Sequence, residues 1–363
     1  MRLLKTMRHT YTNASTKLKE KIIIAGITHL SEFQAENLNK LVDVLAKENN
    51  EVETIGNEFL PMRNVFSNKF AYDLIKKKTH IASYIGFGSE PPVMDRDAVA
   101  SRHGELAKLG IKHIVTEEEL LSIHQARSNA EKRAMIDQLV AKGVDLVNAV
   151  YLQIEVSRLK ALFLGEFSYN DGNVKIGLDY GVENKVELTG TESWDKETAT
   201  PLSDLIKWND EYVDRNGQSA DVIFMSRETR AMLQTSPEIV KEARGDSPAT
   251  RVSVSELNEV LGGYDLPEIR IVERRSVTAH DIVSGENVVH EYFPKHRVVF
   301  ASHGVGEYQL GITVENGFAP GINLTAKDKD EPIQSIMRSV AAGFPVIEDP
   351  ELLFYADVVE VTP

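Results

Sequence analysis

Ser157 and Lys160 form the pattern that most resembles a nucleophilic site, because they stand three positions apart as Ser-x-x-Lys. In serine acyl enzymes this spacing sets the lysine beside the serine hydroxyl, and a Lys-Thr-Gly sequence accompanies it. The chain contains no Lys-Thr-Gly sequence, and the pattern falls inside a long helical stretch. We therefore interpret Ser157 and Lys160 as residues on successive turns of a solvent-exposed helix face.

The segment 304–311 comes close to the Gly-x-Gly-x-x-Gly fingerprint of dinucleotide-binding proteins, but its third glycine is displaced. That fingerprint needs a strand, a turn and a helix in succession. A strand is predicted at 297–301, yet no convincing helix follows the glycines. We expect a loop that needs a flexible backbone, and we expect the same of Gly86 and Gly88.

The ten histidines are scattered, whereas a transition-metal site needs three or four converging ligands. The acidic residues at 328–331 and Asp171 lack the spacing of a calcium-binding loop. The absence of cysteine excludes disulfide scaffolds, cysteine-ligated zinc, iron–sulfur clusters and cysteine nucleophiles. We expect no metal, no cofactor and no enzymatic activity.

The composition of the 363-residue chain, 42% hydrophobic and 26% charged, is that of a globular protein of about two domains. The longest early apolar run, 22–27, is far shorter than the roughly 18 residues that cross a bilayer. Membrane proteins, collagens and wholly disordered chains are therefore excluded. The net charge of −14 argues against a surface built to bind nucleic acid phosphates.

The N-terminal part is organised as an arm rather than as a domain. Residues 1–21 are basic and show no apolar period, residues 30–46 have the period of a short amphipathic helix, and 59–71 is an apolar, extended stretch. Two β-like stretches, 74–87 and 108–115, then bracket a turn-rich middle. We interpret them as a long protruding hairpin, which is marginally stable alone in water and needs support from elsewhere.

The clearest local signal is the capping box formed by Thr116 and Glu119, which starts a short helix. A second helix is predicted from Ser128 or Asn129 to Leu164, ending at Gly165. At about 1.5 Å per residue, this helix is on the order of 50 Å long, so it acts as a strut.

The rest of the chain alternates helices and strands and forms an α/β unit followed by a strand-rich tail. A hairpin is predicted around an Asp-Gly turn at 170–173. The further predicted helices are 202–215, 227–236, 237–243 and 253–261, and the further predicted strands are 221–225, 268–273, 288–293, 297–301 and two stretches within 333–361.

The sequence contains no recognisable group of acids, bases or nucleophiles, and what remains is an architecture of elements that extend without support. Such elements need neighbouring chains, and copies of the same chain are the simplest neighbours.

Three stretches and their order carry a resemblance to a known family. The first runs from Glu117 through the long helix to the Asp-Gly hairpin, and the second contains Trp194 and the Pro-x-x-Asp sequence that ends at Asp204. The third is a closing pair of strands around the Asp-Pro turn at Asp349. Together they resemble the major capsid protein of tailed bacteriophages, the family of the phage lambda capsid protein E, over about residues 59–361.

The resemblance implies an α+β structure with the Johnson fold of tailed-phage capsid proteins. It implies an N-terminal arm at 1–71, an extended loop at 72–115, a peripheral domain with the long spine helix at 116–200 and 331–363, and an axial domain at 201–330.

It also implies a function: self-assembly into the icosahedral head shell that encloses the double-stranded DNA genome. Two alternatives remain open. An encapsulin-like compartment has the same fold and encloses cargo enzymes instead, and portal, terminase and scaffold genes nearby would exclude it. An enzyme with an unrecognised site in the α/β unit is disfavoured because the sequence shows no catalytic group of acids, bases or nucleophiles.

The expected partners are other copies of the chain in hexamers and pentamers, a scaffolding protein, a portal, a decoration protein, and packaged DNA bound without sequence specificity, with no membrane. The expected location is the virion, after assembly in the host cytoplasm. The residues expected to contact neighbouring subunits are Phe59, Phe66, Ile81, Tyr84, Ile85, Phe87, Pro91, Pro92, Ile111 and Ile114.

Overall fold

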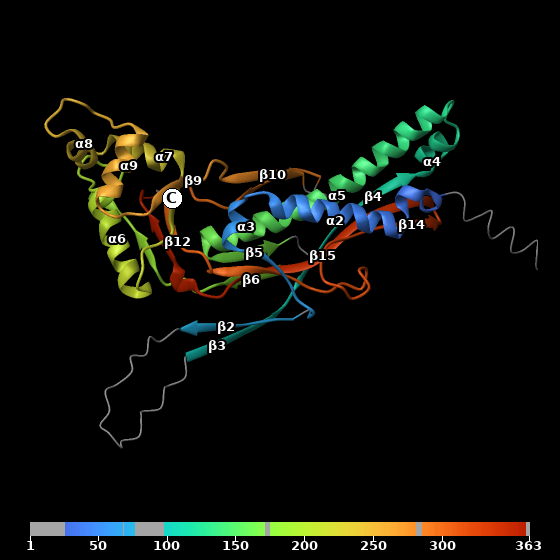
Figure 1. Ribbon diagram of the computed structural model, residues 1–363, viewed down its shortest axis with the longest axis horizontal. Helices are drawn as coiled ribbons and strands as arrows, with labels where there is room; N and C mark the ends of the chain where they lie inside the picture. Colours follow the sequence, from blue (N-terminus) through green and yellow to red (C-terminus); the bar gives the residue numbers. More distant parts are fainter. Residues whose placement is uncertain (1–25, 68, 77–97, 171–174, 281–284, 361–363) are drawn as a thin grey trace, which may run out of the picture.

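The computed structural model describes residues 26–67, 69–76, 98–170, 175–280 and 285–360 (Figure 1). Helices and strands occur mostly in separate runs along the chain, and the strands form two mixed main sheets, as expected of an α+β protein. None of the helices in the described ranges is long and apolar enough to cross a membrane.

The spine of the molecule is helix α5, Asn129–Leu164, which runs through the body in Figure 1. The Ser128 hydroxyl caps its start by accepting a hydrogen bond from the Glu131 amide, and Gly165 ends it with a φ of 67°. The preceding helix α4, Glu117–His124, begins with the predicted capping box, in which the Thr116 hydroxyl accepts from the Glu119 amide. These local signals confirm the predicted helix bounds, because capping is decided by neighbouring residues.

The first sheet lies against the spine and has the strand order β1-β13-β15-β14, with β4 also paired to β15. Helices α2, Ala35–Glu51, and α5 pack on one of its faces. Gly143 faces β14 there, and a Cβ on it would lie 3.4 Å from Leu324, which is an ordinary van der Waals distance. The strands are β1 (Met62–Asn64), β4 (Ala107–Thr116), β13 (Gly306–Leu310), β14 (Asn323–Asp330) and β15 (Ile333–Ile347).

The second sheet has the order β7-β16-β12-β8-β9 and is covered by a group of helices. Its strands are β7 (Lys185–Glu187), β8 (Val222–Met225), β9 (Glu268–Ile271), β12 (Arg297–Ala301) and β16 (Leu353–Asp357). The helices are α6 (Pro201–Asn216), α7 (Arg227–Thr235), α8 (Pro237–Arg244) and α9 (Val254–Gly263).

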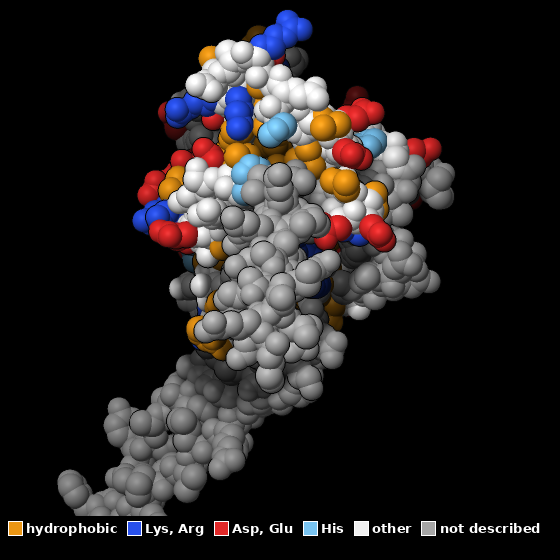
Figure 2. Space-filling view, turned by 90° about the vertical axis from the view of Figure 1, so that its right-hand side faces the viewer, with side chains coloured by type: hydrophobic (Ala, Val, Ile, Leu, Met, Phe, Trp, Pro, Cys, Tyr) orange, Lys and Arg blue, Asp and Glu red, His pale blue; other side chains and the backbone are white. Residues whose placement is uncertain are grey.

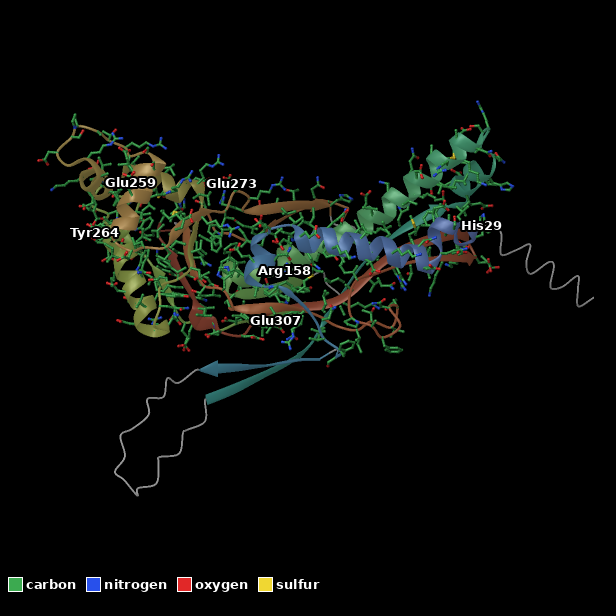
Figure 3. All side chains as sticks on the ribbon, viewed as in Figure 1. His29, Arg158, Glu259, Tyr264, Glu273 and Glu307 are labelled. Atoms are coloured by element: carbon green, nitrogen blue, oxygen red, sulfur yellow. The ribbon has the colours of Figure 1, made fainter. Side chains whose placement is uncertain are left out.

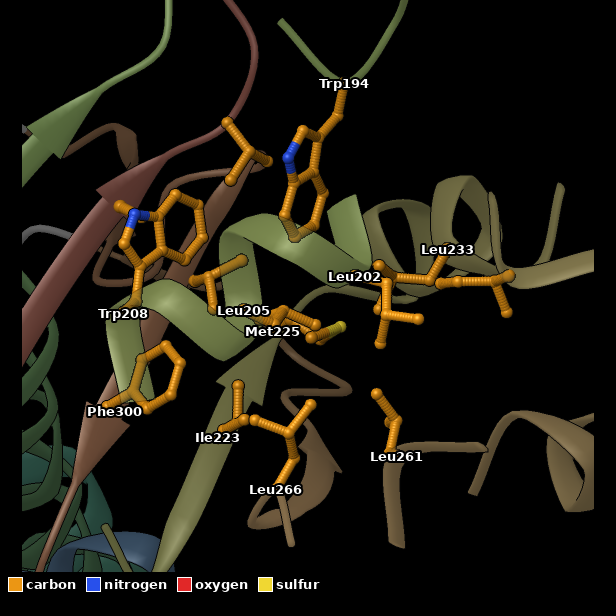
Figure 4. Packing of buried hydrophobic residues seen from close by; sticks show 14 of the residues in the cluster. Trp194, Leu202, Leu205, Trp208, Ile223, Met225, Leu233, Leu261, Leu266 and Phe300 are labelled. Carbon is orange, nitrogen blue, oxygen red and sulfur yellow. The ribbon is translucent and has the colours of Figure 1, made fainter. Parts of the chain in front are cut away.

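The turn that contains Trp194 packs into the hydrophobic core beneath these helices (Figure 4). The Trp194 and Trp208 rings stack with centroids 5.8 Å apart. The Trp194 indole N–H donates to Asp204 Oδ2 at 2.9 Å, which ties the turn to the first turn of α6. Burial raises the pKa of Asp204, although this hydrogen bond opposes the rise. Both residues are therefore held by packing within this unit.

The remaining elements are three two-stranded sheets and several single turns of helix. The sheets are β2–β3 (Lys69–Lys76 and Ala98–Glu105), β5–β6 (Glu166–Asn170 and Lys175–Asp179) and β10–β11 (Ser276–His280 and Asn287–Glu291). The short helices are α3 (Ile55–Phe59), η2 (Ile27–His29), η3 (Ser31–Phe33), η4 (Gly190–Glu192) and η5 (Pro350–Leu352). The predicted Asp-Gly hairpin pairs as expected on either side of its turn, whose residues 171–174 lie outside the described ranges.

Two predictions about strands are wrong. The stretch 108–115 is not the second arm of the protruding hairpin, because β4 pairs along its whole length with β15 of the first sheet. The second arm is β3 instead. The glycine-rich segment 304–311 is not a loop but contains β13, and Gly306 is required there because a Cβ would lie 2.0 Å from the Val346 carbonyl oxygen.

Strand pairing also differs from the expected division of the chain. β13 and β14, expected in the axial domain at 201–330, belong to the first sheet. β7 and β16, expected in the peripheral domain, belong to the second sheet. Strands β10, β13 and β14 were not predicted from local pattern, and α2 begins at Ala35 because two short turns, η2 and η3, precede it.

Candidate functional site: the ribbon and its supports

The β2–β3 pair, which we name the ribbon, extends away from both main sheets (Figure 1). Its arms are antiparallel and pair from Lys69 with Glu105 to Lys76 with Ala98. Neither arm pairs with any other strand of the described ranges. Two strands alone are marginally stable in water, and the described part of the chain supplies no third strand to support them.

The root of the ribbon, in contrast, is firmly attached to the first sheet. The Val65 amide donates to the Leu310 carbonyl at 2.7 Å, and the Gly311 amide donates to the Ala342 carbonyl at 2.8 Å. A Cβ on Gly311 would lie 2.1 Å from Leu106 and 2.9 Å from the Ser67 carbonyl oxygen. Both ends of the ribbon therefore leave the sheet side by side from a fixed point.

Three of the predicted contact residues have different environments from those expected of one surface. Phe66, at the root, is 80% exposed, and Ile114 is 38% exposed. Ile111 is half-buried against the core between α5 and the first sheet. It lies on the opposite face of β4 from Ile114, because the two are an odd number of residues apart. The predicted residues Ile81, Tyr84, Ile85, Phe87, Pro91 and Pro92 lie outside the described ranges.

Phe59 was predicted to contact neighbouring subunits, and this prediction is wrong because Phe59 is fully buried in its own subunit. Its ring meets Phe224 edge-on at 5.3 Å and stacks on the His303 imidazole at 4.7 Å. It therefore joins the arm segment α3 to the second sheet and is not available to a neighbour. The sequence around Phe59 and Pro61 does not distinguish a residue buried in its own subunit from one that contacts a neighbour.

Charged groups around His303 also hold α3 against the second sheet. His303 Nδ1 lies 2.7 Å from Asp221 Oδ2, and Nε2 lies 3.3 Å from Glu58 Oε1. The His303 amide also donates to Asp221 Oδ2 at 2.7 Å. Burial by itself would raise the pKa of Asp221, but the hydrogen bonds from His303 outweigh it and hold that pKa below its ordinary value. Arg270 pairs with Glu58 on the other side.

The spine anchors the same segment through Arg158, which is only 2% exposed and lies at the centre of the molecule (Figure 3). Arg158 Nη1 donates to Asn57 Oδ1 at 2.5 Å, and Glu155 Oε1 accepts from the Gly56 amide at 3.1 Å. The guanidinium also lies over the Tyr308 ring, 5.5 Å from its centroid. Burial lowers the pKa of Arg158, and Glu155 opposes this shift. Sequence reasoning missed Arg158, although a lone arginine among apolar helix residues was a usable signal.

The nucleophile pattern of Ser157 and Lys160 has a structural explanation. The buried Ser157 hydroxyl donates to the Gln153 carbonyl one turn earlier, at 2.7 Å. Burial lowers the pKa of Lys160, and Glu166 opposes that shift. Ser157 is buried, so the prediction that these residues share a solvent-exposed face is wrong for the serine. Among the described residues, no group of three or more histidines and carboxylates is arranged to hold a metal ion.

The end of the molecule farthest from the second sheet exposes further apolar side chains. Figure 2 views this end and shows hydrophobic side chains gathered in its upper half, with acidic side chains on both flanks. Leu121 of α4 is 49% exposed and Ile333 at the start of β15 is 47% exposed. The protein therefore offers apolar contacts at two places, the ribbon root and this end, and its geometry suits attachment to other chains.

Comparison with known protein families identifies the kind of assembly to which the chain belongs. The family model described as phage major capsid protein E matches residues 37–314, more than three quarters of the chain. The chain belongs to this family. It is a shell-forming phage capsid protein and a component of the virion, as the resemblance implied.

A solved structure supports the fold of this capsid protein. A protein assigned as a prophage capsid protein of Escherichia coli CFT073 superposes with a TM-score of 0.57 at 14% identity, covering 89% of this chain and 99% of that chain. A phage-related protein from Bordetella bronchiseptica RB50 gives a TM-score of 0.48 at 10% identity, covering 88% and 98%. The first likeness confirms the expected α+β capsid fold. No curated protein matches the sequence.

Proposed function

We propose that this capsid protein builds the icosahedral head shell of a tailed phage and that the shell encloses double-stranded DNA. The observation that carries the proposal is the ribbon, which leaves a rigid root and pairs with no third strand of the described ranges. A neighbouring copy is the simplest source of the missing support. Because every copy both gives and receives such a contact, many weak contacts sum to a stable shell.

We assign the extended loop to the ribbon and the residues between its arms. The proposed peripheral domain contains α5 and the first sheet, and the proposed axial domain contains the second sheet with α6 to α9. The proposed arm is everything before β1, and its last helix, α3, is held by Arg158 and His303. This division follows strand pairing and replaces the expected boundaries where the two differ.

The proposed contact residues are Phe66 and Ile114 together with the six predicted residues between the ribbon arms. The exposure of Phe66, at 80%, supports its inclusion, because a large exposed apolar side chain at a rigid position is typical of an interface core.

The proposed partners beyond the chain itself are a scaffolding protein, a portal and a decoration protein, with assembly of hexamers and pentamers in the host cytoplasm. The net charge of −14 supports a shell that contains DNA without binding particular sequences, because like charge opposes tight contact with phosphates. An encapsulin-like compartment is not favoured, since the family that matches is one of phage capsids.

Electron microscopy of the protein expressed with its neighbouring genes tests the proposal. Hollow angular shells are the expected result, and nuclease-protected DNA inside them separates a phage head from an enzyme compartment. Uniform monomers that catalyse a reaction contradict the proposal.

A further inference from the structure

Toward the α4 end of the first sheet, one face is left open and carries a concentration of positive charge; farther along β15 the same face is buried at Val340, Ala342 and Phe344. In β4 the burial alternates, so that Lys108, Lys112 and Ile114 point away from the core beneath α5. Residues paired directly across strands share a face, and the register pairs Lys112 with Arg338. Continuing the register through β15 to β14 places further bases there. This surface, which we name the basic face, contains Lys108, Lys112, Lys327, Lys329 and Arg338.

The centre of the basic face is apolar. Ile114 and Ile336 are direct cross-strand partners, and Lys327 of β14 pairs with Ile336 from the other side. Neighbouring strands are about 4.8 Å apart, so Ile336 lies one strand spacing from Lys327, while Ile114 lies two residues from Lys112 along β4. An apolar centre within a charged rim is the composition of a protein interface.

The charges on this face are only partly neutralised by the chain itself. Glu315 accepts from Lys108 Nζ at 2.7 Å and lies 3.6 Å from Arg338. Lys112, Lys327 and Lys329 are exposed and form no ion pair within the described residues. Three unpaired lysines on one sheet face stand out in a chain that has 55 acidic and 41 basic residues.

We propose that the basic face docks the carboxylates of a second copy of this chain, an inference that rests on the proposed shell function. Two copies that each carry a net charge of −14 repel each other unless their charges are arranged unevenly. A basic face that meets an acidic surface of the neighbour removes this repulsion locally and fixes how the copies are oriented. The same acidic excess disfavours DNA as the occupant, because the rest of the surface repels phosphates.

Zero-length carbodiimide cross-linking of assembled particles tests the contact directly. Particles are made from mixed unlabelled and ¹⁵N-labelled chains, so that mass spectrometry distinguishes links between subunits from links within one. Amide bonds between subunits that join Lys112, Lys327 or Lys329 to Asp or Glu side chains are expected. The proposal is overturned if these lysines link only within their own chain, or not at all, while other lysines link between subunits.

Charge reversal supplies the second test. The double variant K327E/K329E is expected to keep the melting temperature of the wild type and to lower shell yield more than about tenfold, because like charges then face each other. K207E/K241E, which makes the same charge change at exposed positions on α6 and α8, is the matched control and is expected to assemble normally. If the reversed variant is misfolded, the neutral K327Q/K329Q replaces it.

The outcomes separate this inference from the function on which it rests. If the wild type forms no shells, the proposed function fails. If the wild type and both double variants assemble equally, the shell function stands and the basic-face inference fails. Binding of wild-type chains to linear DNA at physiological salt, lost in K327E/K329E, would make nucleic acid the occupant and would also overturn the inference.

Discussion

The guanidinium of Arg158 and the side-chain amide of Asn57 lie 2.5 Å apart, although the two residues are 101 positions apart in the chain. Arg158 lies in the last two turns of the spine, and Asn57 lies in the last helical turn of the arm. The same Asn57 amide donates to the Asn49 and Val52 carbonyls, both at 2.9 Å. This junction fixes the direction in which the chain approaches the ribbon.

Replacing Asn57 with Ala should therefore lower the free energy of unfolding by about 2–3 kcal/mol, because a buried guanidinium loses its nearest acceptor. Urea denaturation measures the change. Asn37→Ala, at an exposed position with one local hydrogen bond, is the control and should cost about 0.5 kcal/mol or less. Equal effects of the two substitutions would show that the junction does not stabilise the fold.

Gly306→Ala should destabilise the protein by about 2–3 kcal/mol, because the new Cβ would lie 2.0 Å from a backbone oxygen that cannot move without disrupting β15. Gly262→Ala in α9 meets no atom within 4 Å and should stabilise by about 0.5–1 kcal/mol. Thermal and urea unfolding of both variants checks the pair. A neutral Gly306→Ala would contradict the assignment of this glycine to close strand packing.

The free energy of unfolding at acidic pH should depend on Asp221. Its pKa is below the ordinary 3.8 in the folded protein, so its contribution is present above pH 3.8 and is lost as the pH falls through the folded-state pKa. Asp221→Asn should be less stable than the wild type at pH 7, and the difference should shrink below pH 3.8. Asp210→Asn, on the exposed side of α6, is the control. A stability difference for Asp221→Asn that stays constant from pH 7 to pH 3 contradicts the role of His303.

The alkaline side should depend on Tyr212, whose hydroxyl is buried against Ser302 at 2.7 Å. Burial raises the pKa of Tyr212 from 10.0 to about 12, although the hydrogen bond with Ser302 opposes the rise. The unfolded chain loses this proton first, so the stabilisation is complete below pH 10 and is lost as the pH rises to about 12. Tyr212→Phe should remove part of this loss in unfolding measurements between pH 9 and 12. If the wild type and the variant lose the same stability between pH 9 and 12, Tyr212 is not the group responsible.

The sequence was most informative where structure is decided by adjacent residues. The bounds of α5 follow from Ser128, Glu131 and Gly165, which act within one turn of the helix ends. The tie between Trp194 and Asp204 is likewise only ten residues long, and both residues belonged to a motif noticed in the sequence.

Pairing between distant segments was not predictable in the same way. Residues 108–115 alternate as any half-buried strand does, and nothing in them identifies β15, more than 200 residues later, as the partner. Phe59 was misassigned for the same reason, because its partners Phe224 and His303 are also distant in sequence. The period of two could have separated Ile111 from Ile114, since an odd spacing puts them on opposite faces of any strand.

The most direct test of the whole account is to remove the ribbon and measure the size of the assemblies. Because Ser67 and Leu106 both lie beside Gly311, a short Gly-Ser linker can replace residues 69–105 without moving the first sheet. Analytical ultracentrifugation should show shells for the wild type and only small species for the shortened chain, with the melting temperature of both nearly the same. Shells formed equally well by the shortened chain would contradict the claim that the ribbon joins subunits.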